Sequence, residues 1–185
     1  MNTVVTSREA ILRTCREIVS EFGLSALTMR FVAKRCNVAL GSIYNYFSSK
    51  NDLAIATIES VWQDIFHVER ICETGMPFLN LVESIFERIK TGMIEYPNFF
   101  TAHSIGFAGG DKGEARQTMD RYFVHMAVGL IENLKNDPNV RADVFDEKFT
   151  LSDFVDFILS GVVSLLMRRK SSCAVLLEMI RRTIY

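Results

Sequence analysis

The sequence has 185 residues, of which 49% are hydrophobic, and this content excludes an intrinsically disordered chain. Three prolines and ten glycines are too few for a turn-rich sheet protein and favour long helices. The net charge of −1 is unevenly spread: residues 1–50 carry seven Lys and Arg against three Glu, whereas the remaining residues carry 14 basic and 19 acidic side chains. A basic N-terminal part on an acidic body favours contact with a polyanion at that end, although ordinary variation in surface charge would give the same count.

The cysteines and the apolar runs limit the cellular setting. The four cysteines show no C-x-x-C pair and no metal-ligand spacing, so we expect buried, reduced thiols in place of a metal site. The longest apolar run, Phe157 to Met167, is shorter than the ~18–20 residues that a membrane span needs. Residues 1–7 do not resemble a signal peptide. We therefore expect a cytoplasmic protein with no membrane partner.

The N-terminal third predicts three short helices followed by a long one. Thr6 and Glu9 form a capping box, and the helix that follows ends at Gly23, with an apolar face of Ile11, Cys15, Ile18, Val19 and Phe22. Thr28 caps a second short helix, after which Asn37 suits a turn with left-handed backbone geometry. A very short third helix is predicted from about Leu40 to Tyr46. Ser49 and Asp52 form a capping pair that opens the long helix. Such closely spaced short helices with a tight turn at residues 36–38 indicate a helix-turn-helix unit.

The rest of the chain also predicts helices. One steps along an apolar face from about Met76 to Tyr96-Pro97, and a short segment over residues 99–107 leads to the glycines at 109–110. Further helices are expected over about residues 114–136, 148–169 and 172–183. The fold class is therefore all-α: a helix-turn-helix domain at residues 1–50, joined by a long helix to a helical body at residues 51–185.

The stretch from Leu24 to Leu53 resembles the DNA-binding signature of the tetracycline-repressor (TetR) family. The matching features are a threonine cap (Thr28), a basic residue (Arg30), an alanine (Ala33), the turn valine (Val38), the recognition segment (residues 41–47) and a downstream Ser-Lys pair (residues 49–50). The match covers about a quarter of the chain. Ala39 departs from the family's usual capping serine, so the third helix is expected to begin without a side-chain cap.

The third helix contains the candidate DNA-reading residues. Ile43 and Phe47 are four residues apart and are expected to face the core, which turns Gly41 and Asn45 outward with Ser42 on a flank. A glycine there permits close approach to the major groove, and an Asn side chain can pair with adenine. The resemblance implies base-reading roles for Arg30 and for the segment from Leu40 to Tyr46.

Hydroxyl and basic groups flank this helix and suit phosphate oxygens. They are the hydroxyls of Thr28, Tyr44 and Tyr46, and the cation of Lys50 at the start of the next helix. The resemblance implies that Tyr44 and Lys50 clamp the DNA backbone. The alternatives are that Tyr46 packs on the first helix, that Arg30 pairs with a surface Glu and that Asn45 is merely solvated.

The last two helices are the candidate dimer interface, because one helix-turn-helix unit reads few base pairs and a palindromic operator needs two. They carry wide apolar stripes at Phe154, Phe157, Ile158, Gly161, Val162, Leu165, Val175, Leu176, Met179 and Ile180. In the resembled family the corresponding helices form a four-helix bundle between two chains, and Gly161 would allow close helix approach. A monomeric core is the alternative.

Aromatic and Met side chains of the central helices are candidates for an apolar ligand pocket, although a packed helical core has the same composition. They are Phe86, Met93, Phe100, Phe107, Phe123 and Met126, with His103 as a polar contact. The resemblance implies a small-molecule effector whose binding changes the spacing of the two DNA-reading heads.

These observations predict a sequence-specific regulator of transcription, and more specifically a repressor that its effector releases from double-stranded operator DNA. A DNA-binding nucleoid or division factor without an effector is the alternative, and activation in place of repression stays open because the DNA contacts are the same. No nucleophile motif, phosphate loop or paired metal ligands appear, so no catalytic residue, metal or cofactor is expected.

Overall fold

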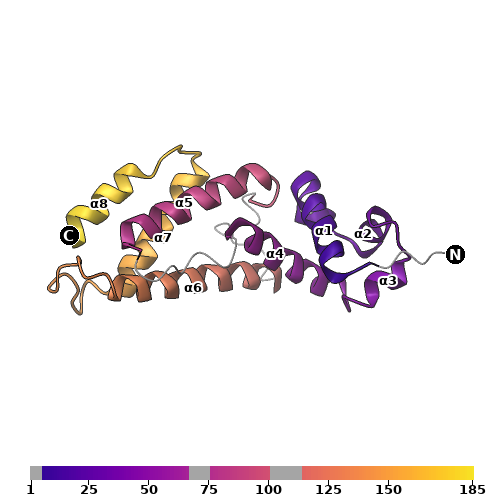
Figure 1. The fold of residues 1–185 in the computed structure, drawn as a ribbon, viewed down its shortest axis with the longest axis horizontal. Helices are drawn as coiled ribbons and strands as arrows, with labels where there is room; N and C mark the ends of the chain where they lie inside the picture. The colour runs from indigo at the N-terminus through magenta and orange to yellow at the C-terminus, as the bar shows by residue number, and fades with distance from the viewer. Residues whose placement is uncertain (1–5, 67–75, 101–113) are drawn as a thin grey trace. The chain divides into compact units, whose positions relative to one another are not determined.

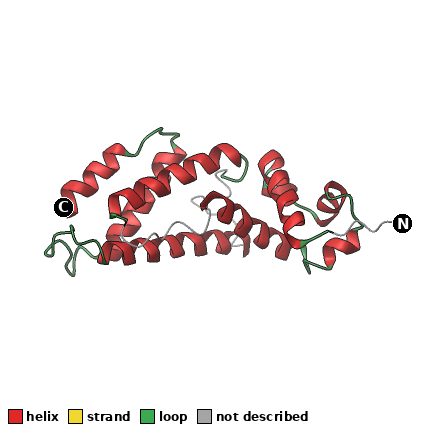
Figure 2. Cartoon of the chain, viewed as in Figure 1, coloured by secondary structure: helices red, strands yellow, loops and turns green. Residues whose placement is uncertain are grey.

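The computed structural model describes residues 6–66, 76–100 and 114–185, and every regular element within those ranges is helical (Figures 1 and 2). This confirms the all-α fold class. The elements are α1 (Arg8–Phe22), η1 (Leu24–Ala26), α2 (Met29–Arg35), α3 (Leu40–Tyr44), α4 (Lys50–Phe66), α5 (Phe78–Glu95), α6 (Glu114–Lys135), α7 (Leu151–Met167) and α8 (Ala174–Ile184). Among these described helices, none combines the length and apolarity that crossing a membrane requires.

The chain forms two compact units. One consists of residues 1–65 and 92–121, and the other of residues 66–91 and 122–185, so the division falls within α5 and α6. We call them the head unit and the body unit. The boundary expected at residue 50 separates a DNA-binding part from the rest of the chain and not one compact unit from another. It stays a prediction.

Local capping determines where α1 begins and ends. The cap is Ser7, whose hydroxyl accepts from the Ala10 N–H at 3.1 Å, so the prediction of a Thr6–Glu9 capping box was wrong by one residue. At the other end Gly23 has a φ of 78°, a conformation that favours glycine, and its N–H donates to the Val19 carbonyl at 2.9 Å. Phe22, predicted on the apolar face of this helix, is 52% exposed at the helix end, where it meets Phe31 edge-on with ring centroids 5.7 Å apart.

The core of the head unit draws on α1, α2, α3 and α4. Its fully buried side chains include Ile11, Ile18, Leu27, Val32, Ile43, Phe47 and Leu53. Further along α4, Trp62 is buried edge-on against Phe99 and Phe100, with ring centroids 6.1 and 5.6 Å away. These contacts are of the kind that aromatic rings prefer, and they join α4 to the residues that follow α5.

The body unit packs α7 against α8. Helix α7 begins later than predicted because Asp146 accepts the Lys148 and Phe149 N–H groups in a turn, after which Thr150 caps the helix at the Asp153 N–H. Gly161 faces Leu176 of the same chain, since a Cβ at Gly161 would lie 3.2 Å from Leu176 Cδ1. The close approach that Gly161 permits is therefore observed between α7 and α8 of one chain.

Candidate nucleic-acid interface

The turn between α2 and α3 sets the direction of the third helix. Asn37 has a φ of 54°, as expected, and its N–H donates to the Lys34 carbonyl at 3.2 Å. The Val38 N–H reaches back to the Ala33 carbonyl at 3.0 Å. These two bonds form a Schellman motif, which closes the end of α2 and turns the chain sharply.

Two buried side chains anchor α3. Ile43 and Phe47 are both buried in the head unit, as their spacing predicted. The regular helix ends at Tyr44, two residues before the predicted end, because the chain tightens: the Tyr46 N–H bonds to the Ile43 carbonyl three residues back. The Phe47 N–H bonds to the same Ile43 carbonyl at 3.0 Å.

The opposite side of α3 is open to solvent. Gly41 and Asn45 are exposed, and a Cβ built on Gly41 would meet no atom within 4 Å. Leu40 and Ser42 are half-buried beside them. Ala39 provides no side-chain cap, as expected from the sequence. The glycine therefore makes no tight contact inside the described head unit, and its small size leaves this side of α3 open.

Hydroxyl and basic groups surround this open side. Tyr44 is 51% exposed, and Lys50 is exposed at the first residue of α4. Ser49 caps α4 by accepting the Asp52 N–H at 3.0 Å, while the Asp52 carboxylate accepts the Ser48 N–H at 2.8 Å. The Lys50 ammonium therefore stands at a capped helix start, where the helix dipole adds to its attraction for a phosphate.

The two candidate residues of α2 have different local roles. The Thr28 hydroxyl accepts the Phe31 N–H at 3.2 Å and so caps α2, and its own O–H can still donate to a phosphate. Arg30 is exposed. The ion pairs that the structure describes in the head unit join Arg16 to Glu9 and Arg35 to Glu21, and neither includes Arg30.

Tyr46 has an intramolecular partner just before α1, which favours the alternative that it packs on the first helix. Its hydroxyl donates to the Thr6 carbonyl at 2.6 Å, across 40 residues of chain. A neighbouring residue, Arg8, places its guanidinium over the Phe47 ring at 5.3 Å from the centroid. The only sequence signal for Arg8 was its charge, because periodicity cannot show that the start of α1 meets the end of α3.

The candidate pocket residues are distributed over both units. Phe86, Phe123 and Met126 belong to the body unit, and Met93 and Phe100 to the head unit; His103 and Phe107 lie outside the described residues. Phe86, Phe100 and Met126 are buried, whereas Met93 and Phe123 are half-buried. Their role as a ligand pocket stays a prediction.

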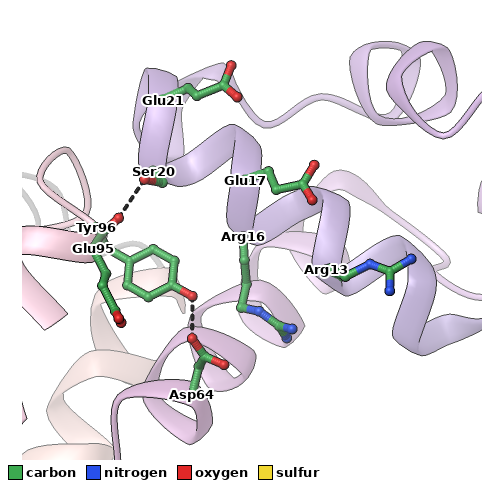
Figure 3. Close-up of a pocket in the computed structure, with 8 residues that line it drawn as sticks. All are labelled: Arg13, Arg16, Glu17, Ser20, Glu21, Asp64, Glu95 and Tyr96. Atoms are coloured by element: carbon green, nitrogen blue, oxygen red, sulfur yellow. Dashed lines mark hydrogen bonds between the residues drawn. The ribbon is translucent and has the colours of Figure 1, made fainter.

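A hollow of about 460 Å³ in the head unit has a different chemical character (Figure 3). Its walls are polar and charged, and come from α1, α4 and the end of α5: Arg13, Arg16, Glu17, Ser20, Glu21, Asp64, Glu95 and Tyr96. The Tyr96 hydroxyl donates to Asp64 at 2.5 Å. Burial and this carboxylate raise the pKa of Tyr96, so the phenol stays protonated. No predicted pocket residue lines this hollow.

The candidate dimer residues fall into two sets on the body unit. One set is buried within the chain and consists of Phe154, Ile158, Val162, Leu176 and Ile180. Another set is uncovered: Phe157 is 61%, Val175 75% and Met179 52% exposed. Gly161 and Leu165 are half-buried, and Gly161 faces Leu176 of the same chain. Half of the predicted residues are thus buried inside one chain, and three leave exposed apolar side chains.

The residues that form this helix-turn-helix surface also match known DNA-binding regulators in sequence. Residues 11–57 match the sequence model of the bacterial regulatory proteins of the tetR family. The HTH-type transcriptional repressor KstR of Mycobacterium tuberculosis is 24% identical over 167 residues, which cover 89% of this chain and 73% of that protein.

Two similar solved structures share the fold over most of the chain. The Bacillus subtilis transcriptional regulator FadR, in complex with stearoyl-CoA, has a TM-score of 0.68 at 18% identity, covering 97% of this chain and 100% of that one. AibR in complex with isovaleryl coenzyme A and operator DNA has a TM-score of 0.55 at 15% identity, covering 85% and 84%.

Proposed function

We propose that the chain is a sequence-specific transcriptional repressor that binds operator DNA as a homodimer, because residues 11–57 match the sequence model of the bacterial regulatory proteins of the tetR family. A small, largely apolar effector releases it. The observation that carries the proposal is the open side of α3, where Gly41 faces empty space above the buried anchors Ile43 and Phe47.

The residues of this surface take distinct roles toward DNA. Tyr44, Lys50 and the Thr28 hydroxyl contact phosphates and so position the head on the duplex. Arg30, Leu40, Ser42 and Asn45 approach the base edges, with Asn45 suited to adenine and Leu40 to a thymine methyl. Gly41 leaves room for the groove wall between them.

The second copy binds on the uncovered apolar face of α7 and α8. Phe157, Val175 and Met179 are exposed in the single chain, and exposed large apolar side chains on two packed helices suit an interaction site. A twofold dimer places two heads on a palindrome, which gives the site length that one head lacks.

Acyl-coenzyme A thioesters are the first effector class to test. FadR was solved with stearoyl-CoA and AibR with isovaleryl coenzyme A, and both share this fold. An acyl chain would need an apolar lining such as the predicted pocket residues Phe86, Phe123 and Met126 can offer.

The test measures fluorescence anisotropy of the protein against labelled duplexes that tile the DNA upstream of its own gene, at physiological salt. Nanomolar binding of two chains to one near-palindromic tile, reversed by stearoyl-CoA, supports the proposal. Weak, salt-sensitive binding to every tile would contradict it and favour a DNA-coating factor. Specific binding that no acyl-CoA reverses would remove this effector class.

A double variant tests the placement of the surface. Tyr44→Ala with Lys50→Ala should weaken binding to all tiles and flatten the salt dependence, because two phosphate contacts are lost from each head. Lys135→Ala, which removes one exposed charge from α6, serves as the control and should bind like the wild type. Survival of specific affinity in the double variant would show that the recognition helix lies elsewhere.

A further inference from the structure

The start of α1 lies against the end of the candidate DNA-reading segment. The Tyr46 hydroxyl donates to the Thr6 carbonyl at 2.6 Å, and the Arg8 guanidinium lies over Phe47 at 5.3 Å from the ring centroid. Tyr46 and Phe47 are the two residues after Asn45, one of the predicted base-reading residues. Two independent contacts therefore hold the first turn of α1 beside this surface.

We propose that Arg8 is a further DNA-backbone contact and that Tyr46 is a positioning residue which acts through it. This inference rests on the proposed function, since it adds a contact to the same surface. It also revises the role of Tyr46, whose hydroxyl was expected to meet a phosphate itself. Its proton is instead committed to Thr6, two residues before Arg8.

The charge of Arg8 is available to a partner. Within the head unit as described, the arginines that pair with carboxylates are Arg16, with Glu9 at 3.6 Å, and Arg35, with Glu21 at 2.9 Å. Arg8 is exposed, and its described contact is the face of an uncharged ring. The ring contact supplies the guanidinium with no hydrogen-bond acceptor, and a guanidinium can bind phosphate with two parallel hydrogen bonds.

A backbone contact has a measurable electrostatic consequence. Each neutralised phosphate contributes about −0.9 to the slope of log K against log salt concentration, so one Arg8 from each chain of a dimer contributes roughly −1.8. When the salt concentration rises from 50 to 200 mM, the wild type should therefore lose roughly twelvefold more affinity for DNA than a variant without the Arg8 charge. The contact carries no sequence information, so its removal should weaken specific and random duplexes alike.

The experiment measures this slope by anisotropy with a fluorescein-labelled 30-base-pair duplex of random sequence and with the bound upstream tile. Arg8→Met keeps an apolar side chain over Phe47 without the charge, and it should flatten the slope by roughly 1.8 on both duplexes. Arg8→Lys should restore most of the slope. Arg13→Met is the matched control, because Arg13 is an exposed arginine of the same helix that lines the polar hollow, and its slope should equal that of the wild type.

The role of Tyr46 is tested by a double-mutant cycle with Tyr46→Phe, which removes only the hydroxyl. If Tyr46 acts by positioning Arg8, then Tyr46→Phe weakens DNA binding in the wild type but has little further effect in the Arg8→Met background. Thermal unfolding of each variant checks that the head remains folded. Equal effects of Tyr46→Phe in both backgrounds would show a direct contact and overturn the positioning role.

The failure of this inference can be told apart from the failure of the proposed function. Wild-type protein that binds one tile specifically, while Arg8→Met leaves the salt slope unchanged, would overturn the Arg8 contact and keep the regulator. Wild-type protein that binds no duplex at any salt concentration would overturn both.

Discussion

The side-chain amide of Asn98 donates to the carbonyl oxygen of Ser20 at 2.9 Å, and the same amide reaches the Glu21 carbonyl at 3.1 Å. These carbonyls lie in the last turn of α1, where no further helical N–H can reach them. The Ser20 hydroxyl in turn donates to the Glu95 carbonyl at 2.6 Å. The residues after α5 thus complete the end of the first helix of the head unit.

Asn98→Ala should lower the free energy of unfolding by about 1 kcal/mol, because two helix-end carbonyls lose their donor and must rely on water. The measurement is urea denaturation monitored by circular dichroism. The slope of the unfolding free energy against urea concentration should be the same in the variant and the wild type. Asn80→Ala is the control, since Asn80 is an exposed residue of α5. Equal stability of the two variants would show that the Asn98 bonds contribute nothing.

Gly41→Ala should separate stability from DNA binding. Alanine is favoured over glycine in a helix by up to about 1 kcal/mol, and a Cβ at Gly41 meets no atom within 4 Å, so the variant should be slightly more stable. The same methyl group would obstruct the groove wall and weaken operator binding by at least about tenfold, or 1.4 kcal/mol. Gly129→Ala in α6 is the matched control, because it also meets no atom and should stabilise the protein without changing affinity. Wild-type affinity of Gly41→Ala would contradict the placement of α3.

Phe157→Glu combined with Val175→Glu should convert the dimer to monomer without unfolding it. Both side chains are uncovered in the single chain, so a charge there is solvated in the monomer but buried in a dimer. Light scattering after size-exclusion chromatography reports the mass. Ile94→Glu, at a position that is 76% exposed on α5, should leave the mass unchanged. A double variant that still has the mass of two chains would place the interface elsewhere.

Asp137 should make the stability of the body unit depend on acid. Burial alone would raise its pKa, but N–H groups of Phe78 and Asn139 and the Tyr185 hydroxyl donate to it, and these bonds lower the pKa below the ordinary value. The carboxylate therefore stabilises the folded state fully above about pH 4, and this contribution is lost as the pH falls through the folded-state pKa.

Asp137→Asn tests this dependence. At pH 7 the variant should be less stable than wild type by about 2 kcal/mol, because hydrogen bonds to a charged group are replaced by neutral ones. The difference should shrink as the pH is lowered below about 4. Urea unfolding at pH 7 and pH 3 measures it, and Asp156→Asn, at an exposed position of α7, should show no such trend. A difference that stays constant with pH would exclude this role for the charge.

Much of the head unit follows from local sequence. The Thr28 cap, the turn at Asn37 and the buried pair Ile43 and Phe47 each depend on residues a few positions apart, and all were predicted correctly. Where the prediction was wrong, as for the Ser7 cap, two adjacent residues had the same capping ability. Short-range hydrogen bonding and steric limits act within one turn of the chain, so the order of residues is enough to specify them.

The sequence by itself therefore determined the helical class, the local cap and turn of the helix-turn-helix and the outward side of α3. Only the tertiary structure decided which distant groups meet: Tyr46 with Thr6, Asn98 with Ser20, and Leu176 with Gly161. It also divided the apolar stripes of α7 and α8 into a buried set and an uncovered set. Helical periodicity marks a face as apolar, but the element that covers that face depends on how the whole chain packs.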